Sequence, residues 1–429
     1  MVRELKHTEI GDIPVDWELQ TFDETFRVIS NNTLSRENLN NRGGAVRNIH
    51  YGDILTKFPE VLDCSDDEIP FVNDLSLLSS STQLLQDGDV VIADTAEDET
   101  VGKVTEVQNL GDSKLVAGLH TILCRVKKGD FAPGWLGYYM NSDLFHNQIL
   151  PYITGIKVSS ISKGAISETL ILVPPFDEQE KIVQSLNKIQ LLMTAETNVV
   201  NKIKLVKNGC LSKMFPQKDD TVPEMRLPGF TEAWEQRKLS DIAVLTSSKR
   251  VHAEDYVEAG VPFYRGKEIS ELKEHKPISE VLYITEYKYN EISSMYGSPK
   301  EGDLLITAVG TLGNTWVIDQ TPFYFKDGNL IWFKDIKCNP KYLDYAMSTA
   351  DGQKKILASA IGSNQKALTM VKLNELEFMF PGKAEQDKIA EYFSYLDNLI
   401  TLHQCKCDKY SNIKKGMMSD LLTGKIRLV

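Results

Sequence analysis

Two short stretches of this sequence combine lysine with small polar residues, and both lie in windows without acidic residues. The first window, residues 144–167, contains TGIKVSSISKG, and the second, residues 352–374, contains IGSNQKA. In a chain with 60 acidic residues, two acid-free windows of this length are unusual. Lys, Ser, Asn and Gln side chains reach phosphate oxygens and base edges, so the pattern favours non-covalent binding of nucleic acid. The candidate binding residues are Lys157, Ser159, Ser160, Lys163, Asn364, Gln365 and Lys366.

A second pair of basic clusters is weaker but points to the same chemistry. RGGAVRNIHYGD spans residues 42–53, and VPFYRGKE spans residues 261–268. The competing interpretation is that any one cluster is an ordinary solvated loop. The parallel behaviour of the two halves of the chain argues against that interpretation. The candidates from this pair are Arg47, Asn48, Arg265 and Lys267.

The sequence offers no motif for covalent or metal chemistry, so we predict no catalytic residue and no metal site. An adenine-methylating loop needs Asn/Asp-Pro-Pro-Tyr/Phe, and residues 339–342 lack the second proline. A nucleotide-binding P-loop needs Gly-x4-Gly-Lys-Ser/Thr, and residues 260–268 depart from it in spacing and in their final residue. Residues 286–288 could end a nuclease motif, but no partner acid stands out. We expect the isolated histidines to be structural; these are His50, His120 and His146.

The bulk composition indicates a folded protein of two or three domains. The chain has 429 residues, of which 42% are hydrophobic and 25% are charged. No apolar run reaches the ~18 residues of a membrane span, and the N-terminus lacks the apolar core of a signal peptide. The six scattered cysteines predict reduced thiols and a cytoplasmic protein. The net charge of −12 opposes a generally basic nucleic-acid surface, so such binding must be local.

The candidate residues lie in matching places because the sequence is duplicated. DEQEKI at residues 177–182 recurs as AEQDKI at residues 384–389, 207 residues later. The same offset holds without a gap for residues 155–215 of the first copy. Upstream, small gaps are needed to match DGDVVIA at 87–93 with EGDLLIT at 301–307. Two copies are too few for a solenoid, so we predict two variable globular parts, each followed by a matched segment.

Each matched segment is predicted to be a long helix. The first begins after Pro174-Pro175, where Asp177 and Glu180 resemble a capping box. Apolar residues then recur at alternating spacings of four and three over more than four heptads, which is typical of a coiled coil. An ordinary amphipathic surface helix is the alternative. The predicted helix-pairing residues are Ile182, Leu186, Ile189, Met193, Val200 and Ile203 in the first helix, and Ile389, Phe393, Leu396, Ile400, Cys407 and Tyr410 in the second.

Chain connectivity sets the direction in which these helices would pair. The second globular part follows the first helix directly and also precedes the second helix, so paired helices must be antiparallel. The duplication then predicts a pseudo-twofold axis across the middle of the pair. Pairing about the helix midpoints brings Glu196 near Cys407 and Val200 near His403. We therefore predict a polar layer that fixes the register of the helices.

The globular parts alternate strand-like and helix-like runs, which predicts a mixed α/β (α+β) fold with small sheets. The predicted strands are residues 90–94, 121–126 and 169–173, then 303–309, 329–334 and 376–380. A single helix is predicted in each part, over residues 134–150 and 340–360. The predicted domains are a first globular domain at 1–174, a first long helix at 175–216, a second globular domain at 217–381, and a second long helix with a C-terminal tail at 382–429.

Five segments together carry a resemblance to a known family. They are IGDIPVDWE near the N-terminus, LPGFTEAWEQRKLSDI at the start of the second half, VPPFDEQEKI and FPGKAEQDKI at the helix starts, and GMMSDLLTGKIRL at the C-terminus. Along nearly its whole length the chain resembles the specificity subunits of type I restriction–modification systems. One departure from the pattern is Pro381-Gly382, where the first copy has Pro-Pro.

The resemblance implies a division of labour within a phage-defence complex. The globular domains at 1–174 and 217–381 would be recognition domains, and each would read one half of a split sequence in double-stranded DNA. The helices would set the gap between the halves and hold two modification subunits, which bring S-adenosylmethionine and methylate adenine. Restriction subunits would use ATP and Mg²⁺ to translocate and cleave DNA. The chain itself would be no enzyme, bind no cofactor and act in the cytoplasm without a membrane.

Two other classes of protein remain open on the residues alone. One is a DNA enzyme with degenerate motifs, which would depend on S-adenosylmethionine or a metal in isolation. The other is a scaffold with two folded heads on a coiled coil that does not bind DNA. Such a scaffold would show no salt-dependent retention on DNA.

Overall fold

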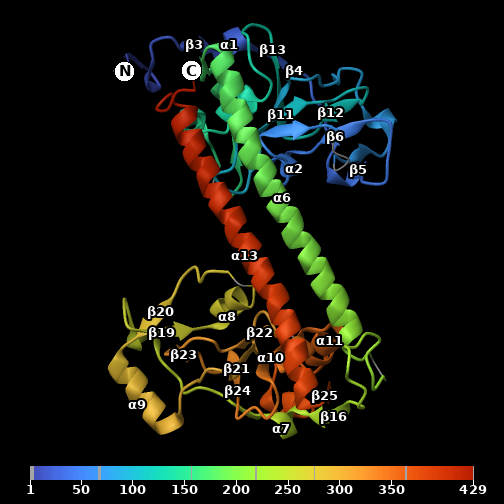
Figure 1. Cartoon of the computed structure of the whole chain (residues 1–429). Coiled ribbons are helices and arrows are strands. Elements are labelled where there is room, and N and C mark those ends of the chain that lie inside the picture. Colours follow the sequence, from blue (N-terminus) through green and yellow to red (C-terminus); the bar gives the residue numbers. More distant parts are fainter. Residues whose placement is uncertain are drawn as a thin grey trace. The chain divides into compact units, whose positions relative to one another are not determined.

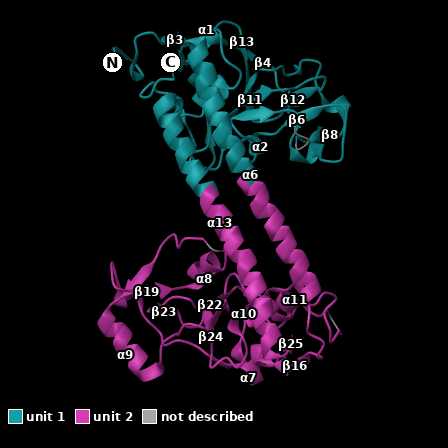
Figure 2. Ribbon diagram, in the orientation of Figure 1, with its two compact units in different colours: residues 1–195, 407–429 teal, residues 196–406 magenta. Residues whose placement is uncertain are grey.

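The structure is a computed structural model of the chain, and it describes residues 4–65, 69–155, 157–217, 220–274, 276–362 and 365–428. The chain divides into two compact units (Figure 2). Unit 1 comprises residues 1–195 and 407–429, and unit 2 comprises residues 196–406. Each unit therefore contains one globular part together with a segment of each of the two long helices, α6 (Phe176–Met214) and α13 (Lys383–Leu421). The domain limits predicted from the sequence stay a prediction.

Unit 1 is organised around strand β9 (Val90–Ala93), whose four side chains are all buried. Val90 and Ile92 enter one hydrophobic core, whereas Val91 and Ala93 enter another, because successive side chains of a strand point to opposite faces. A strand covered on both faces reads as a continuous apolar run, which is why VVIA is recognisable in the sequence. Its sheet has the order β4 (Phe26–Ile29), β13 (Thr121–Val126), β9, β11 (Val104–Gln108) and β7 (Val61–Asp63).

Smaller sheets and short helices complete unit 1 (Figure 1). A second sheet has the order β12 (Leu115–Ala117), β6 (Arg47–Ile49), β8 (Phe71–Val72) and β5 (Leu39–Asn40). The paired strands are β1 (Leu5–Thr8) with β2 (Gly11–Pro14), β3 (Glu18–Thr21) with β15 (Leu170–Val173), and β10 (Thr95–Ala96) with β14 (Ser159–Ser160). The helices are α1 (Phe22–Thr25), α2 (Tyr51–Thr56), α3 (Trp135–Tyr139), α4 (Asp143–Ile149) and α5 (Lys163–Ser167), with 3-10 turns at Arg36–Asn38, Leu75–Leu77 and Leu150–Tyr152.

Unit 2 repeats this plan around strand β21 (Leu304–Thr307). Leu304 and Ile306 enter one core and Leu305 enters another. The sheets have the orders β17 (Val244–Thr246), β24 (Leu330–Lys334), β21, β22 (Thr315–Val317), and β18 (Tyr256–Val257), β20 (Leu282–Ile284), β19 (Val261–Tyr264), β23 (Tyr324–Phe325). Strand β16 (Glu235–Lys238) pairs with β25 (Glu377–Phe380). The helices are α7 (Leu239–Ile242), α8 (Gly266–Lys273), α9 (Glu286–Tyr296), α10 (Pro340–Ser348), α11 (Ala350–Ala358) and α12 (Met370–Asn374), with a 3-10 turn at Ala253–Asp255.

The mixed α/β fold with two long helices is confirmed, and the predicted buried strands are present as β9, β13, β15, β21, β24 and β25. The predicted single helices are wrong in both units. Residues 134–150 form α3 and α4, which separate at Ser142, and residues 340–360 form α10 and α11, which separate at Thr349. The hydroxyl group of Ser142 accepts from the Phe145 N–H, and that of Thr349 accepts from the Gly352 N–H. Each hydroxyl thus caps the start of a new helix, and the two residues are 207 positions apart.

The long helices lie side by side and run antiparallel within each unit (Figure 2). In unit 1, the Lys414 ammonium of α13 donates to Gln190 of α6 at 2.7 Å and to Glu60 of the globular part. In unit 2, Lys207 of α6 forms an ion pair with Asp397 of α13. The lysines are 207 residues apart and each lies 5.3 Å from a tyrosine ring centre, that of Tyr138 or Tyr345. Lys207 and Lys414 therefore hold the helices to each other and to the globular parts.

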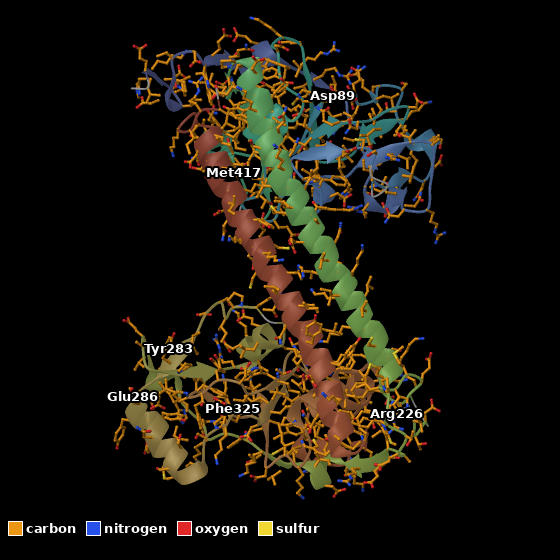
Figure 3. The ribbon with its side chains drawn as sticks, in the orientation of Figure 1. Asp89, Arg226, Tyr283, Glu286, Phe325 and Met417 are labelled. Carbon is orange, nitrogen blue, oxygen red and sulfur yellow. The ribbon has the colours of Figure 1, made fainter. Side chains whose placement is uncertain are left out.

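An arginine also clamps the start of one long helix in each unit. In unit 1, Arg427 donates to both oxygens of the buried Glu178 at 2.6 and 2.7 Å, and also to Asp16. In unit 2, Arg226 donates to both oxygens of the buried Glu385 at 2.7 Å (Figure 3). The two glutamates are 207 residues apart, in DEQEKI and AEQDKI. A buried carboxylate needs such a bidentate partner, which explains why this acidic phrase occurs twice.

Candidate nucleic-acid interface

Each unit contains the same small hairpin, formed by the polar stretch of its acid-free window. In unit 1, Thr154 and Ser160 exchange two backbone hydrogen bonds of 3.0 and 2.8 Å. In unit 2, Ile361 and Ala367 exchange two of 2.9 Å. The partners differ by 207 positions in both cases, so the duplication is kept residue by residue here. We call these two loops the recognition hairpins, residues 154–160 and 361–367.

Glycine is required at the same place in both recognition hairpins. Gly155 has φ of 116° and Gly362 has φ of 115°, which is a region that side chains rarely adopt. A Cβ on Gly155 would lie 1.9 Å from the Val158 carbonyl oxygen, and one on Gly362 would lie 2.3 Å from that of Gln365. The chain therefore folds back too tightly for any other residue at either position.

Both recognition hairpins dock beside the central strand of their unit. The Ile161 N–H donates to the Asp94 carbonyl at 2.9 Å, and the Leu368 N–H donates to the Ala308 carbonyl at 2.9 Å. In unit 1 the hairpin strand β14 pairs with β10, just beyond β9. In unit 2, Val309, just beyond β21, forms a bridge with Ala367. The rigid sheet of each unit thus holds an exposed polar loop at one edge.

Most candidates from the acid-free windows lie on these loops. Lys157, Gln365 and Lys366 are exposed, whereas Ser159 and Ser160 are half-buried in β14. Lys163 is exposed at the first turn of α5, directly after its capping residue Ser162. Asn364 lies outside the described residues. None of these placements tests DNA contact, so these residues remain predictions.

The second pair of clusters lies at equivalent helix starts next to the hairpins. His50 is the N-cap of α2 and Arg265 is the N-cap of α8. Helix α2 packs against β9 and β10, and α8 packs against β21. A Cβ on Gly266 would lie 3.9 Å from the Val309 carbonyl oxygen, beside the strand end that meets the hairpin. The fold therefore brings the two kinds of cluster together in each unit, although they are about 100 residues apart in sequence.

Two of the candidates in these clusters are engaged inside the protein. Asn48 is fully buried, accepts from Asn32 at 2.9 Å and donates to the Ile49 carbonyl at 3.2 Å, so the structure does not place it on a binding surface. Arg47 is half-buried, donates to the Cys64 carbonyl at 2.6 Å and lies over the Phe71 ring. These side chains hold the second sheet of unit 1 together, which is a role that basic composition cannot reveal.

The other two candidates remain near the surface of unit 2. Arg265 donates to the buried Glu268, and this hydrogen bond raises the pKa of the guanidinium group. Lys267 is exposed and lies 3.9 Å from a carboxylate oxygen of Glu280. Arginine is the side chain that most often contacts guanine in DNA, and the buried Glu268 holds the Arg265 guanidinium group in one orientation. In the chain without DNA, Arg265 is paired with the Glu268 carboxylate.

Unit 1 contains an arginine in a comparable place that sequence reasoning missed. Arg36 donates to Asp53 of α2 at 2.6 Å and contacts the His50 ring at 3.3 Å. Burial, assisted by the Arg36 charge, lowers the pKa of His50. Asp53 and Glu268 each lie three residues after the N-cap of their helix. In both units, therefore, an acidic residue in the first turn of this helix binds an arginine. No local pattern signals Arg36, because its partners are 14 and 17 residues away.

The helix-pairing candidates are placed as follows. Ile182, Leu186, Ile189, Val200, Ile389, Phe393, Leu396 and Ile400 are buried, and Met193, Ile203, Cys407 and Tyr410 are half-buried. The predicted polar layer is confirmed in unit 2, where Glu196 hydrogen-bonds His403 and lies 3.5 Å from the Lys406 ammonium. His403 lies one turn from Cys407, the predicted neighbour of Glu196, whereas Lys207 with Asp397 and Gln190 with Lys414 lie within one residue of the predicted register. The hydrogen bond from His403 is the main cause that lowers the pKa of Glu196.

Three further properties of the described part of the chain concern metal ions, thiols and membranes. No group of three His, Cys, Asp or Glu side chains in these ranges could hold a metal ion. The cysteines are all free thiols, and burial raises the pKa of Cys64 to about 11. Across the described ranges, every helix is too short or too polar to cross a bilayer.

Comparison with known proteins identifies relatives in sequence. Residues 231–409 match the family model of the type I restriction modification DNA specificity domain. The chain is 25% identical to a Methanocaldococcus jannaschii protein named as the type I restriction enzyme MjaX specificity subunit, over 99% of this chain and 96% of the relative. It is also 25% identical to the Haemophilus influenzae specificity subunit S.HindORF215P, over 60% of this chain and 64% of the relative.

Solved structures share the fold. The S subunit of a type I restriction–modification system from M. genitalium matches with a TM-score of 0.58 and 13% identity, over 98% of this chain and 99% of that one. A chain from a structural study of assembly and conformational transition in the type I system matches with a TM-score of 0.54 and 15% identity, over 96% and 99%. Along nearly its whole length the chain is therefore similar to type I restriction–modification specificity subunits, and residues 231–409 match the DNA specificity domain of that family.

Proposed function

We propose that this chain recognises a two-part sequence in double-stranded DNA, with one half read by each unit. The observation that carries the proposal is the repeated recognition hairpin, whose described residues share the backbone hydrogen bonds and the glycine conformation in both units but differ in their side chains. The duplicated fold would place two similar loops against the DNA, one in each unit. Because their side chains differ, the two loops would prefer different bases. The exposed lysines Lys157 and Lys366 would contact phosphates.

We further propose that the chain is a non-catalytic scaffold for other subunits. Two modification subunits would bind the long helices, bring S-adenosylmethionine and methylate adenine in the target. Restriction subunits would join them and use ATP and Mg²⁺ to translocate and cleave unmodified DNA. The net charge of −12 supports this division, because much of the surface would face protein and the partners would supply part of the basic DNA channel. The complex would act in the cytoplasm, where it meets invading DNA.

Methylation mapping tests the proposal. The chain and its modification subunit would be expressed together in a host without adenine methylation, and methylated adenines would be located across the genome. We expect one motif made of two short sequences separated by a fixed unread gap. Neither protein expressed alone should methylate that motif. Methyl transfer by the isolated chain, or a methylated motif that is independent of this chain, would contradict the proposal.

A further inference from the structure

His120 has a backbone conformation that is unusual for its residue type. Its φ is 58°, in the left-handed region that non-glycine residues seldom occupy. The surrounding strands impose this conformation. The His120 carbonyl accepts from the Asp94 N–H at 3.1 Å, and the adjacent Thr121 pairs with Ala93 of β9. Residues held in such conformations cluster at functional sites, which directs attention to the side chain.

The side chain of His120 is oriented by its neighbours but remains partly exposed. Its Nδ1 lies 3.2 Å from the Thr95 hydroxyl and 3.4 Å from an Asp94 carboxylate oxygen. The imidazole ring meets the Tyr51 ring edge-on, with 5.2 Å between their centres. The His120 side chain is 43% exposed, and within the described chain its Nε2 has no hydrogen-bond partner. One nitrogen is therefore held by the protein while the other is available.

This histidine lies beside the recognition hairpin of unit 1. Thr95, which contacts the imidazole, pairs with Ser160 of the hairpin. Tyr51 begins α2, the helix that packs against the same short strand, β10. The hairpin, the start of α2 and His120 therefore form one surface, built from three separate parts of the sequence.

Unit 2 repeats the backbone hydrogen bond of this surface but neither its left-handed residue nor its polar side chains. The Asn329 carbonyl accepts from the Ala308 N–H at 2.7 Å, as the His120 carbonyl does from the Asp94 N–H. Ala308 and Val309 thus stand where unit 1 has Asp94 and Thr95, and Asn329 stands where it has His120. A position needed only for folding would tolerate similar residues in both units. A reading position should differ between two surfaces that read different sequences.

We propose that His120 is a base-reading residue of unit 1, an inference that rests on the proposed function in DNA recognition. The Thr95 hydroxyl donates its proton to Asp94 at 2.8 Å, so its oxygen is left to accept from His120, and Nδ1 is the protonated nitrogen. The neutral imidazole then presents Nε2 as an acceptor. In the major groove an acceptor matches the amino group of adenine or cytosine. His120 would therefore select one of these bases at one position of the half-sequence read by unit 1.

The test uses the assembled complex and the target defined by methylation mapping. Binding would be measured for that duplex and for duplexes with each base pair of the half-sequence changed in turn. In the His120→Gly variant we expect discrimination at one base pair to fall roughly 5- to 150-fold, with the other half-sequence read as before. Glycine accepts the left-handed backbone, so this variant should fold with a melting temperature at least as high as the original.

A matched control is His7→Ala. His7 is also an exposed histidine paired with a carboxylate in unit 1, with 2.8 Å between its Nδ1 and Asp12. The His7→Ala variant should bind DNA as tightly as the original complex and discriminate between base pairs equally well. Unchanged discrimination in His120→Gly would overturn the inference, and so would an equal loss for every duplex, which would indicate a phosphate contact. Failure of the proposed function itself is distinguishable, because the original complex would then select no two-part target.

Discussion

Lys157 and Lys366 are exposed in the two recognition hairpins, and their charge is the simplest property to test. We expect Lys157→Ala and Lys366→Ala each to reduce the slope of log binding constant against log salt concentration by about one. A phosphate contact should weaken all DNA sequences equally, whereas a guanine contact should reduce discrimination at one base pair by ~1–3 kcal/mol. The measurement is a salt titration of DNA binding by the assembled complex.

Lys128→Ala provides the control for the hairpin lysines. Lys128 is exposed in the same unit but lies in the loop after β13, where its backbone N–H donates to the Thr25 carbonyl. Its replacement should leave the salt slope unchanged. If both hairpin variants also keep the original affinity and slope, the recognition hairpins are not the DNA-binding surface.

At the level of elements, the arginine clamps should control the stability of each unit separately. Arg427→Ala leaves the Glu178 carboxylate buried without its bidentate partner, and breaking a buried ion pair costs about 3 kcal/mol or more. We expect faster amide hydrogen exchange in β3, β15 and the first turns of α6, and a lower melting temperature. Arg226→Ala should produce the same effect in β16, β25 and the start of α13. Equal loosening of both units by either variant would show that the clamps do not act locally.

The Arg427 clamp also predicts a pH dependence. The hydrogen bond from Arg427 lowers the pKa of Asp16 below its ordinary 3.8. A carboxyl group with a depressed pKa in the folded state stabilises that state above its unfolded pKa, and the contribution disappears as pH falls through the folded value. The stability difference between the original chain and Arg427→Ala should therefore shrink below about pH 3.8.

The polar layer of the helix pair provides a second test of an element. Glu196→Leu with His403→Leu extends the apolar seam and removes a pair that fixes register. We expect a higher melting temperature, or exchange kinetics that reveal a shifted helix register. The pKa of Glu196 is lowered, so its contribution is lost as pH falls below its ordinary 4.5, and the advantage of the double variant should grow there. An unchanged melting temperature at both pH values would mean that the pair contributes nothing to the helices.

At the scale of the whole molecule, the long helices should set the gap between the two half-sequences. One heptad inserted after Asn201 and another after Asp408 lengthens each helix by ~10.5 Å while keeping the apolar seam nearly in phase. At ~3.4 Å per base pair, the unread gap should grow by about three base pairs. The half-sequences should stay the same, because the globular parts are untouched.

Methylation mapping of the lengthened chain gives the readout. Three base pairs also rotate the duplex by about 100°, so the DNA must twist for both units to engage. A second variant with three heptads in each helix adds ~31 Å, close to one full turn of DNA, and removes most of this rotation. A methylated site whose half-sequences change while its gap does not would show that the helices are not the ruler.

The sequence by itself determined the duplication, the two long helices and the buried strands. These features depend on periodic apolar patterns that are local in the chain, and β13 coincides with its predicted residues 121–126. The sequence also indicated two polar stretches at matching places, because an acid-free window recurs in each half, but it did not predict that they form hairpins. The polar layer at Glu196 and His403 followed from the heptad positions, and the helix register followed to within one residue at Lys207 with Asp397.

Only the tertiary structure decided what depends on contacts between distant residues. The break of each predicted helix at Ser142 or Thr349 is a choice between continuing a helix and capping a new one, and packing of the following turn settles it. Asn48 is buried because Asn32 and the second sheet enclose it. His120 joins the hairpin surface because β9, β10 and α2 bring residues 50, 95, 120 and 160 together. No local sequence pattern predicts these contacts, because the side chains become neighbours only after the sheets have formed.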